Sequence, residues 1–132
     1  YNPQKMSANI MFSNDLAHKV YAACDIFLMP SMFEPCGLSQ LIAFKYGTIP
    51  VVRETGGLKD TVIPYNEYTG EGNGFSFSPY NASDMMYILR MALGFFADKE
   101  IWNKLITNAM KLDFSWKASA KKYDEMYANL LK

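Results

Sequence analysis

Two short apolar runs with a helix-patterned stretch between them constrain the fold of this chain most. The runs are DIFLMP (25–30) and TIPVV (48–52), and the stretch between them is LSQLIAFKYG (38–47). DIFLMP is a continuous apolar run, typical of a strand buried on both faces of a parallel sheet, and TIPVV is a further strand. A strand, a helix and a second strand form a crossover unit, so the chain is predicted to be α/β. Pro50 lacks an amide hydrogen and is therefore placed at the start of its strand.

The rest of the chain extends this alternation and then becomes helical. Residues 53–73 are rich in glycine and polar residues, which favours loops around a short helical turn. Asn81 and Asp84 stand where an N-cap and its partner would begin a helix. The other predicted elements are two strands, 7–12 and 74–78, and four helices, 13–24, 81–96, 98–112 and 115–132.

Composition excludes several classes of function. Thirteen basic residues balance thirteen acidic ones, so neither nucleic acid nor an anionic membrane is expected as the main partner. The apolar runs are too short to cross a bilayer. Cys24, Cys36 and the single histidine, His18, offer neither a zinc knuckle nor a disulfide framework, which is usual for a cytosolic protein with free thiols. The chain starts at Tyr1 and reaches an apolar run within seven residues, so we expect it to be part of a longer protein.

The stretch SMFEPCGLSQ (31–40) is the first candidate site. It follows a predicted strand and precedes a predicted helix, which places it at the carboxyl edge of the sheet, where ligands of α/β proteins bind. Gly37 allows the backbone to approach a ligand closely. The free amides of Gly37, Leu38 and Ser39 are expected to point from the helix N-terminus at an anion such as a diphosphate, with the Ser39 hydroxyl as a further donor.

Glu34 requires a different interpretation, because its carboxylate would repel a phosphate. It is expected to face neutral hydroxyl groups, as on a sugar. The residues alone leave a second interpretation open, in which Glu34 is only a negative charge near a helix N-terminus and Gly37 only turn chemistry. The same choice applies to TGGL (55–58), which either brings the amides of Gly56 and Gly57 to the cleft or forms a flexible loop.

Aromatic residues and the histidine are less informative. Phe12 ends the predicted strand 7–12 on the same edge, where it could stack on a nucleobase or belong to the core. His18 lies within a predicted helix without a catalytic partner in register, and we interpret it as structural. Trp102 and Trp116 are expected to pack in the core or between domains.

The block PSMFEPCGLSQLIAFKYGTIPVVRETGGLKDTV (30–62) resembles the signature of bacterial glycogen synthases and plant starch synthases. The flanking segments LAHKVYAACDIFLMPS (16–31), NGFSF (73–77) and DFSWKASAKKYDEMY (113–127) extend the resemblance over nearly the whole chain. It implies a two-domain GT-B glycosyltransferase with Rossmann-like domains facing across a cleft. Residues 1–132 would then be part of the C-terminal, donor-binding domain, with about 98–132 as a helical tail.

The resemblance also implies an activity. The family's members are retaining enzymes that transfer glucose from ADP-glucose, or in some cases UDP-glucose, to the non-reducing end of an α-1,4-glucan without a metal or other cofactor. A bacterial cytoplasmic location is expected before a plastid one. The implied partners are ADP-glucose or ADP, the glucan and the missing N-terminal part of the same protein. The rival hypothesis is a nucleotide-binding or assembly module without transferase activity.

Residue roles carried over from the family concern eight positions. Glu34 matches the active-site glutamate that bonds hydroxyls of the donor glucose. The implied substrate-binding residues are the adenine-stacking position Phe12, the turn residues Cys36, Gly37 and Leu38, the nucleotide contact Ser39, and the glycines Gly56 and Gly57.

Three departures qualify these roles. Ile42 replaces the second glutamate that holds the ribose in sucrose- and mannosyl-transferring relatives, which favours the glycogen and starch synthases. Glu54 stands where many members have a basic residue, so a phosphate contact there is in doubt. The family's lysine-bearing glycine loop, its active-site histidine and its Arg/Lys clamp have no counterparts here. Because such charges stabilise the departing diphosphate, the chain alone is predicted to be inactive.

Overall fold

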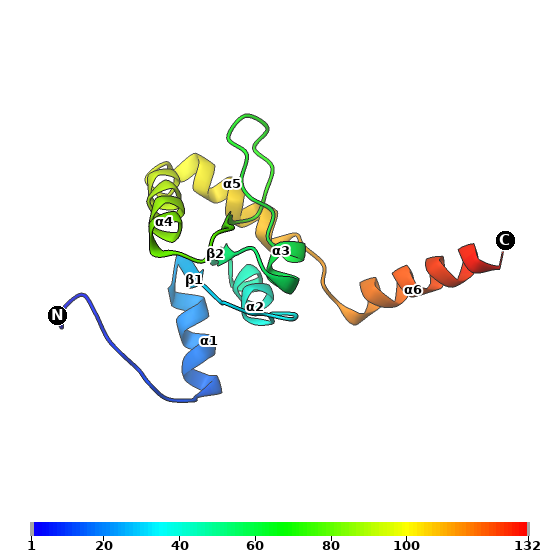
Figure 1. The fold of residues 1–132 in the computed structure, drawn as a ribbon, viewed down its shortest axis with the longest axis horizontal. Coiled ribbons are helices and arrows are strands. Elements are labelled where there is room, and N and C mark those ends of the chain that lie inside the picture. Colours follow the sequence, from blue (N-terminus) through cyan, green and yellow to red (C-terminus); the bar gives the residue numbers. More distant parts are fainter. Residues whose placement is uncertain (1, 132) are drawn as a thin grey trace.

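A three-stranded parallel sheet forms the centre of the molecule in the computed structural model, which describes residues 2–131. The strands are β1 (Ile26–Met29), β2 (Ile49–Arg53) and β3 (Phe75–Phe77), in the order β1-β2-β3. The helices are α1 (Asn14–Ala23), α2 (Ser39–Tyr46), α3 (Gly56–Thr61), α4 (Ala82–Phe96), α5 (Lys99–Met110) and α6 (Trp116–Leu130) (Figure 1). The predicted α/β class and parallel sheet are therefore confirmed.

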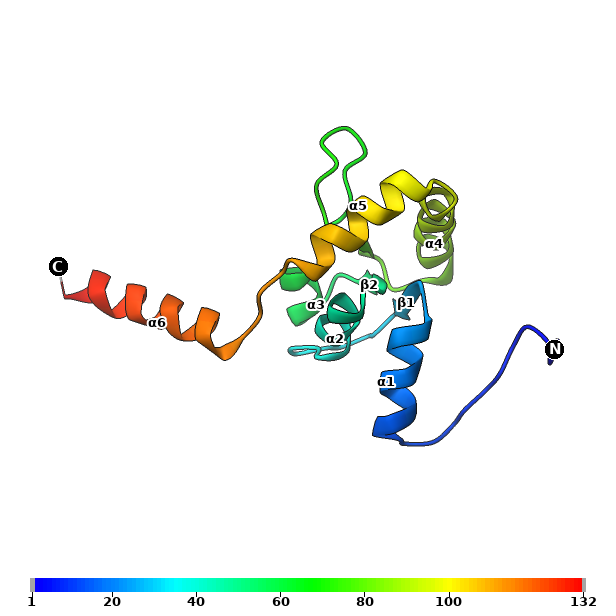
Figure 2. The same cartoon turned by 180° about the vertical axis from the view of Figure 1, so that it is seen from behind.

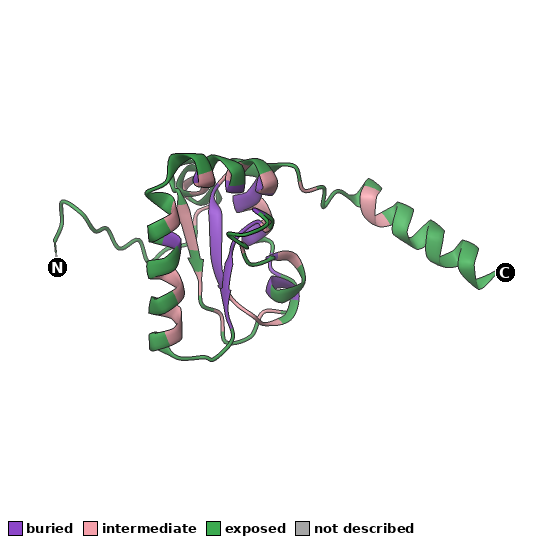
Figure 3. Ribbon diagram, turned by 90° about the horizontal axis from the view of Figure 1, so that it is seen from above, coloured by how far each residue is buried: buried purple, intermediate pink, exposed green. Residues whose placement is uncertain are grey.

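The central strand β2 organises the core. Its first four residues are buried, and Figure 3 shows β2 buried along nearly its whole length. Phe44 of α2 and Leu58 of α3 are fully buried and belong to the same core cluster, as does Trp102 of α5. Pro50 is the second residue of β2, close to the predicted position at the strand's start.

Two expectations about strands are wrong. Residues 7–12 form no strand; they lie in an extended coil, where Ile10 is 99% and Phe12 89% exposed. β1 is only half-buried, and its Leu28 is exposed. Among the described residues β1 pairs with β2 alone, so one of its edges has no neighbouring strand. Apolar composition makes a strand possible, but a partner strand makes it form and buries it.

The helix termini follow the predicted chemistry at several places. The side chains of Ser13 and Asn81 cap α1 and α4, as expected, by accepting the amide hydrogens of Leu16 and Asp84. α2 ends at Gly47, which has a φ of 76°. Glycine favours this left-handed conformation, which ends the helix at the predicted residue.

The C-terminal helix α6 extends away from the body on the side opposite to the N-terminal coil, as Figures 1 and 2 both show. It has no buried residue, and Trp116 is 91% exposed, so Trp116 is not part of the core of the described chain, whereas Trp102 is. In the connector before α6, hydrogen bonds from Ser115 lower the pKa of Asp113. Within residues 2–131, none of the helices is both long enough and apolar enough to cross a membrane.

Candidate functional site

The turn between β1 and α2 is built around Gly37. Gly37 is buried and has a φ of 70°, a conformation that glycine adopts without strain. Its amide donates a hydrogen bond to Glu34 Oε1 at 3.0 Å. The expectation that the Gly37 amide is free is therefore wrong. The bond fixes the Glu34 carboxylate over the turn and leaves its other oxygen available as an acceptor.

The N-terminus of α2 has no side-chain cap. Within residues 2–131, the amide hydrogens of Leu38 and Ser39 have no hydrogen-bond acceptor. α3 also begins without a side-chain cap, at Thr55. By contrast, side chains cap the other four described helices, α1, α4, α5 and α6. Uncapped helix N-termini offer free donors and partial positive charge, and the two that occur here lie at one edge of the sheet.

Backbone contacts join these two N-termini directly. The Gly57 amide donates to the carbonyl oxygen of Pro35 at 3.2 Å. A Cβ atom on Gly56 would lie 1.8 Å from the carbonyl oxygen of Glu34, and one on Gly57 would lie 1.9 Å from that of Cys36. The interpretation of TGGL as a flexible loop is therefore wrong: the segment begins α3, and both glycines are required because two backbone segments touch. The expectation that the Gly57 amide reaches the cleft is also wrong, because that amide is engaged with Pro35.

Arg53, at the end of β2, was not singled out from the sequence. Its Nη1 donates to the carbonyl oxygen of Met32 at 2.7 Å, and its Nε donates to that of Ser78 at 3.2 Å. The guanidinium also lies 5.3 Å from the centre of the Tyr80 ring. Arg53 thus ties the segments that follow all three strands. The signal in the sequence was a charged residue directly after four apolar residues of a central strand.

Glu54 and the remaining predicted residues complete the edge. Glu54 Oε1 accepts a hydrogen bond from the Ser76 hydroxyl at 2.7 Å, so its carboxylate is held against β3. Cys36 and Leu38 are exposed on the turn, and Ser39 is half-buried at the first residue of α2. All three lie where the sequence predicted them, beside Glu34.

Phe12 and His18 lie apart from the turn. Phe12 precedes α1 in the exposed coil, so it is not a core residue of the described chain, and no hydrogen bond or ring contact in residues 2–131 joins it to the turn. His18 Nδ1 lies 3.2 Å from the Tyr46 hydroxyl, across the α1–α2 contact. This contact supports the structural interpretation of His18.

A cavity of about 330 Å³ opens beside the strand ends. It is lined by Pro30, Phe77, Tyr80, Asn81, Ala82 and Met85. None of the predicted site residues lines it. The candidate site is thus the turn with the adjoining start of α2, which carries a fixed carboxylate and the free amides of Leu38 and Ser39.

Comparisons with known proteins agree on one family. A family model described as glycosyl transferases group 1 matches residues 4–111. The glycogen synthase of Desulforamulus reducens is 60% identical over 129 residues, which cover 98% of this chain and 27% of that protein. The glycogen synthase of Clostridium perfringens is 62% identical over 130 residues, with the same two shares covered. The chain thus spans 27% of the length of these curated relatives.

Two solved structures share the fold. The catalytic domain of starch synthase IV from Arabidopsis thaliana, bound to ADP and acarbose, matches with a TM-score of 0.80 and 41% identity. That match covers 90% of this chain and 25% of the other. A sucrose-phosphate synthase from Thermosynechococcus elongatus matches with a TM-score of 0.60 and 26% identity, over 85% of this chain and 27% of the other.

Proposed function

This chain belongs to the group 1 glycosyl transferases, and from that premise we propose that it forms part of the donor site of a glucosyltransferase. The whole enzyme transfers glucose from ADP-glucose to the non-reducing end of an α-1,4-glucan, in the bacterial cytoplasm. The predicted resemblance to glycogen and starch synthases is confirmed by relatives with 60% and 41% identity. The ADP bound to the starch synthase supports a nucleotide as the ligand of this chain.

One observation carries the proposal: the Glu34 carboxylate is fixed by the Gly37 amide beside the two uncapped helix N-termini. A sugar nucleotide has two chemically different ends that suit this surface. The sugar's hydroxyl groups can donate to the free carboxylate oxygen, and the diphosphate can accept from the amides of Leu38 and Ser39. The carboxylate thus binds the glucose end of the donor, and the neighbouring amides bind its diphosphate.

The reaction breaks the bond between glucose C1 and the diphosphate oxygen, whose electron pair leaves with ADP. C1 then bonds to the oxygen of a glucan hydroxyl group, and the proton of that hydroxyl is released with the ADP. Glu34 orients the sugar in this scheme and does not attack it. The free amides of Leu38 and Ser39 and the dipole of α2 stabilise the negative charge on the leaving ADP. Arg53 is engaged with backbone carbonyls, so further positive charge must come from other parts of the protein. The proposal needs no metal ion.

Glucose incorporation into glycogen by the full-length protein tests this function. With ADP-glucose as donor, Glu34→Gln is expected to lower kcat/KM by about 100-fold or more, because the amide keeps the size of the side chain but weakens its hold on the sugar hydroxyls. Glu67→Gln is the matched control. Glu67 is an exposed residue of the 63–74 loop, so its replacement should leave the rate unchanged. A Glu34→Gln enzyme with most of its activity would overturn the assignment.

The same assay distinguishes the transferase from the alternative, a nucleotide-binding or assembly module. Such a module would bind ADP without incorporating glucose. An active wild-type protein therefore excludes it, and an inactive one that binds ADP would favour it.

A further inference from the structure

Gln40 lies directly beneath the turn, and its side chain is completely buried, with 0% exposure. Its Nε2 lies 2.8 Å from the carbonyl oxygen of Gly37 and 3.3 Å from that of Cys36. Both are acceptors only, so the amide must present its nitrogen to them. A buried polar side chain in the second position of α2 thus holds two successive peptide groups of the proposed donor site.

Because a peptide group is planar, a side chain that fixes the direction of its carbonyl group also fixes the direction of its N–H. All peptide bonds of the described chain are trans, so the N–H and C=O of each peptide point in opposite directions. Because Gln40 draws the Cys36 carbonyl inward, the Gly37 amide points outward, where it donates to Glu34 Oε1. Because Gln40 draws the Gly37 carbonyl inward, the Leu38 amide also points outward, and within residues 2–131 it has no acceptor.

Gln40 also connects the turn to α3. Its Nε2 lies 3.2 Å from Thr61 Oγ1, and the Thr61 hydroxyl donates in turn to the carbonyl oxygen of Gly57 at 2.6 Å. Gly57 bonds back to the turn through Pro35. One buried amide therefore links the N-terminal regions of both uncapped helices.

The second polar atom of Gln40 argues against a role in packing alone. Gln40 Oε1 is buried and has no hydrogen-bond partner among the described residues. A Cβ atom on Gly37 would lie only 2.4 Å from this oxygen, so the glycine is what lets the amide fit under the turn. An apolar side chain of the same length would fill the space without an unpaired oxygen, whereas only the amide offers the donors that the two carbonyls accept.

We propose that Gln40 is a positioning residue of the transferase site, acting through the Cys36 and Gly37 peptides on the Glu34 carboxylate and the Leu38 amide. The inference rests on the proposed function, because it names what orients the groups that hold the sugar and the diphosphate. Without the side-chain donors, the Gly37 peptides are free to rotate, since glycine tolerates many backbone conformations.

The test uses the full-length protein with Gln40→Met, which keeps the length of the side chain and removes both donors. We expect kcat for glucose transfer to fall by about 10- to 100-fold, because a small misorientation of the reacting groups has effects of that size. KM for ADP-glucose should change less than kcat, because the free amide of Ser39 at the N-terminus of α2 remains.

Asn108→Leu is the matched control. Asn108 Nδ2 also donates to two carbonyl groups of a glycine loop, those of Gly70 and Gly72, but at the other edge of the sheet. This variant should lower the thermal midpoint of unfolding and keep kcat within about twofold of wild type, as expected for an independent site. A merely structural Gln40 would behave in the same way as Asn108.

Two more variants keep the proposal testable if Gln40→Met fails to fold. Thr61→Val removes the link to α3 and should lower kcat by a smaller factor. Gln40→Glu replaces the donor with a carboxyl that can donate only when protonated. Its activity relative to wild type should therefore rise as the pH is lowered.

The outcomes separate this inference from the proposed function. A wild-type protein that does not transfer glucose overturns both. An active wild type whose Gln40→Met variant matches Asn108→Leu in kcat overturns the role of Gln40 alone. If Gln40→Met does not fold, a Gln40→Glu variant whose activity relative to wild type is independent of pH overturns it.

Discussion

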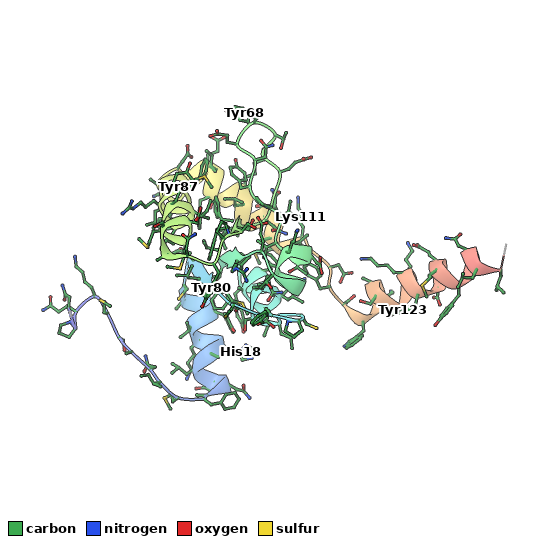
Figure 4. The ribbon with its side chains drawn as sticks, viewed as in Figure 1. His18, Tyr68, Tyr80, Tyr87, Lys111 and Tyr123 are labelled. Carbon is green, nitrogen blue, oxygen red and sulfur yellow. The ribbon has the colours of Figure 1, made fainter. Side chains whose placement is uncertain are left out.

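Two glycine loops at opposite edges of one sheet are held by the same device and present different surfaces. At the carboxyl edge, Gln40 of α2 clamps the carbonyl groups of Cys36 and Gly37. At the other edge, Asn108 of α5 clamps those of Gly70 and Gly72. Figure 1 shows the two loops on opposite sides of the body, the turn beside α2 and the 63–74 loop beyond α5. In Figure 4, Tyr68 marks the tip of the second loop, far from Tyr80.

The loops differ in where their amide hydrogens go. In the 63–74 loop, Asn66 Oδ1 accepts from the amides of Tyr68 and Thr69, and the Asn66 carbonyl oxygen accepts from Gly70. Within the described residues, only the amides of Glu67 and Gly72 in that loop lack an acceptor, and no helix begins there. At the carboxyl edge, the amides of Leu38 and Ser39 have no acceptor in residues 2–131. A side-chain amide therefore holds both loops, whether or not the loop binds a ligand. The turn between β1 and α2 differs in having unpaired amide donors at a helix N-terminus beside a carboxylate, which suit an anionic ligand.

The largest effect on stability and activity is expected where the turn between β1 and α2 touches the start of α3. Gly57→Ala would place a Cβ atom 1.9 Å from the Cys36 carbonyl oxygen, so the segments must separate. We expect a loss of about 3 kcal/mol in unfolding free energy and a fall in glucose transfer of about 100-fold. Denaturant unfolding and initial rates of the full-length protein measure the two effects.

Gly72→Ala tests whether a similar change in the 63–74 loop affects stability without affecting catalysis. Gly72 has a φ of 110°, and a Cβ atom there would lie 2.6 Å from the Pro64 carbonyl oxygen. This variant should also be destabilised, but the protein that remains folded should keep its kcat. Gly94→Ala in α4 is the neutral control, because its Cβ atom meets nothing within 4 Å. An inactive, stable Gly72→Ala enzyme would contradict the division between the two edges.

A smaller effect is expected from Arg53→Lys. Lysine keeps the charge but loses the fork that reaches Met32 and Ser78 together, so the ends of the strands are held less firmly. The unfolding free energy should fall by about 1 kcal/mol and kcat/KM by about 10-fold. Arg90→Lys, on the exposed surface of α4, should change neither quantity. Equal results for the two arginines would show that Arg53 does not shape the site.

Local patterns predicted much of this fold. The existence of β2 as a strand, the cap at Asn81 and the end of α2 at Gly47 were each predictable from residue type and spacing. The strand expected at 7–12 and the full burial of β1 depend on strands that must pair alongside them. Composition does not state whether such partners are present, and both predictions were wrong.

The candidate site divides in the same way. Glu34 and the turn were predictable because a strand, a glycine and a helix start follow one another in sequence. Arg53 was missed because its partners are backbone carbonyl groups of residues more than twenty positions away in sequence. Gln40 was missed although its carbonyl partners are only three and four residues away. A carbonyl group has no sequence signature, so such contacts appear only in three dimensions.

Hydrogen–deuterium exchange of the full-length protein, with and without saturating ADP, tests the central claim most directly. Unpaired donors at the N-terminus of α2 should bind the diphosphate, while the 63–74 loop, which begins no helix and whose amides are mostly paired, should not. We predict slower exchange in peptides that cover 38–41 and 55–58, and unchanged exchange in those that cover 66–72. Protection of 66–72, or none at 38–41 when ADP is bound, would contradict the account.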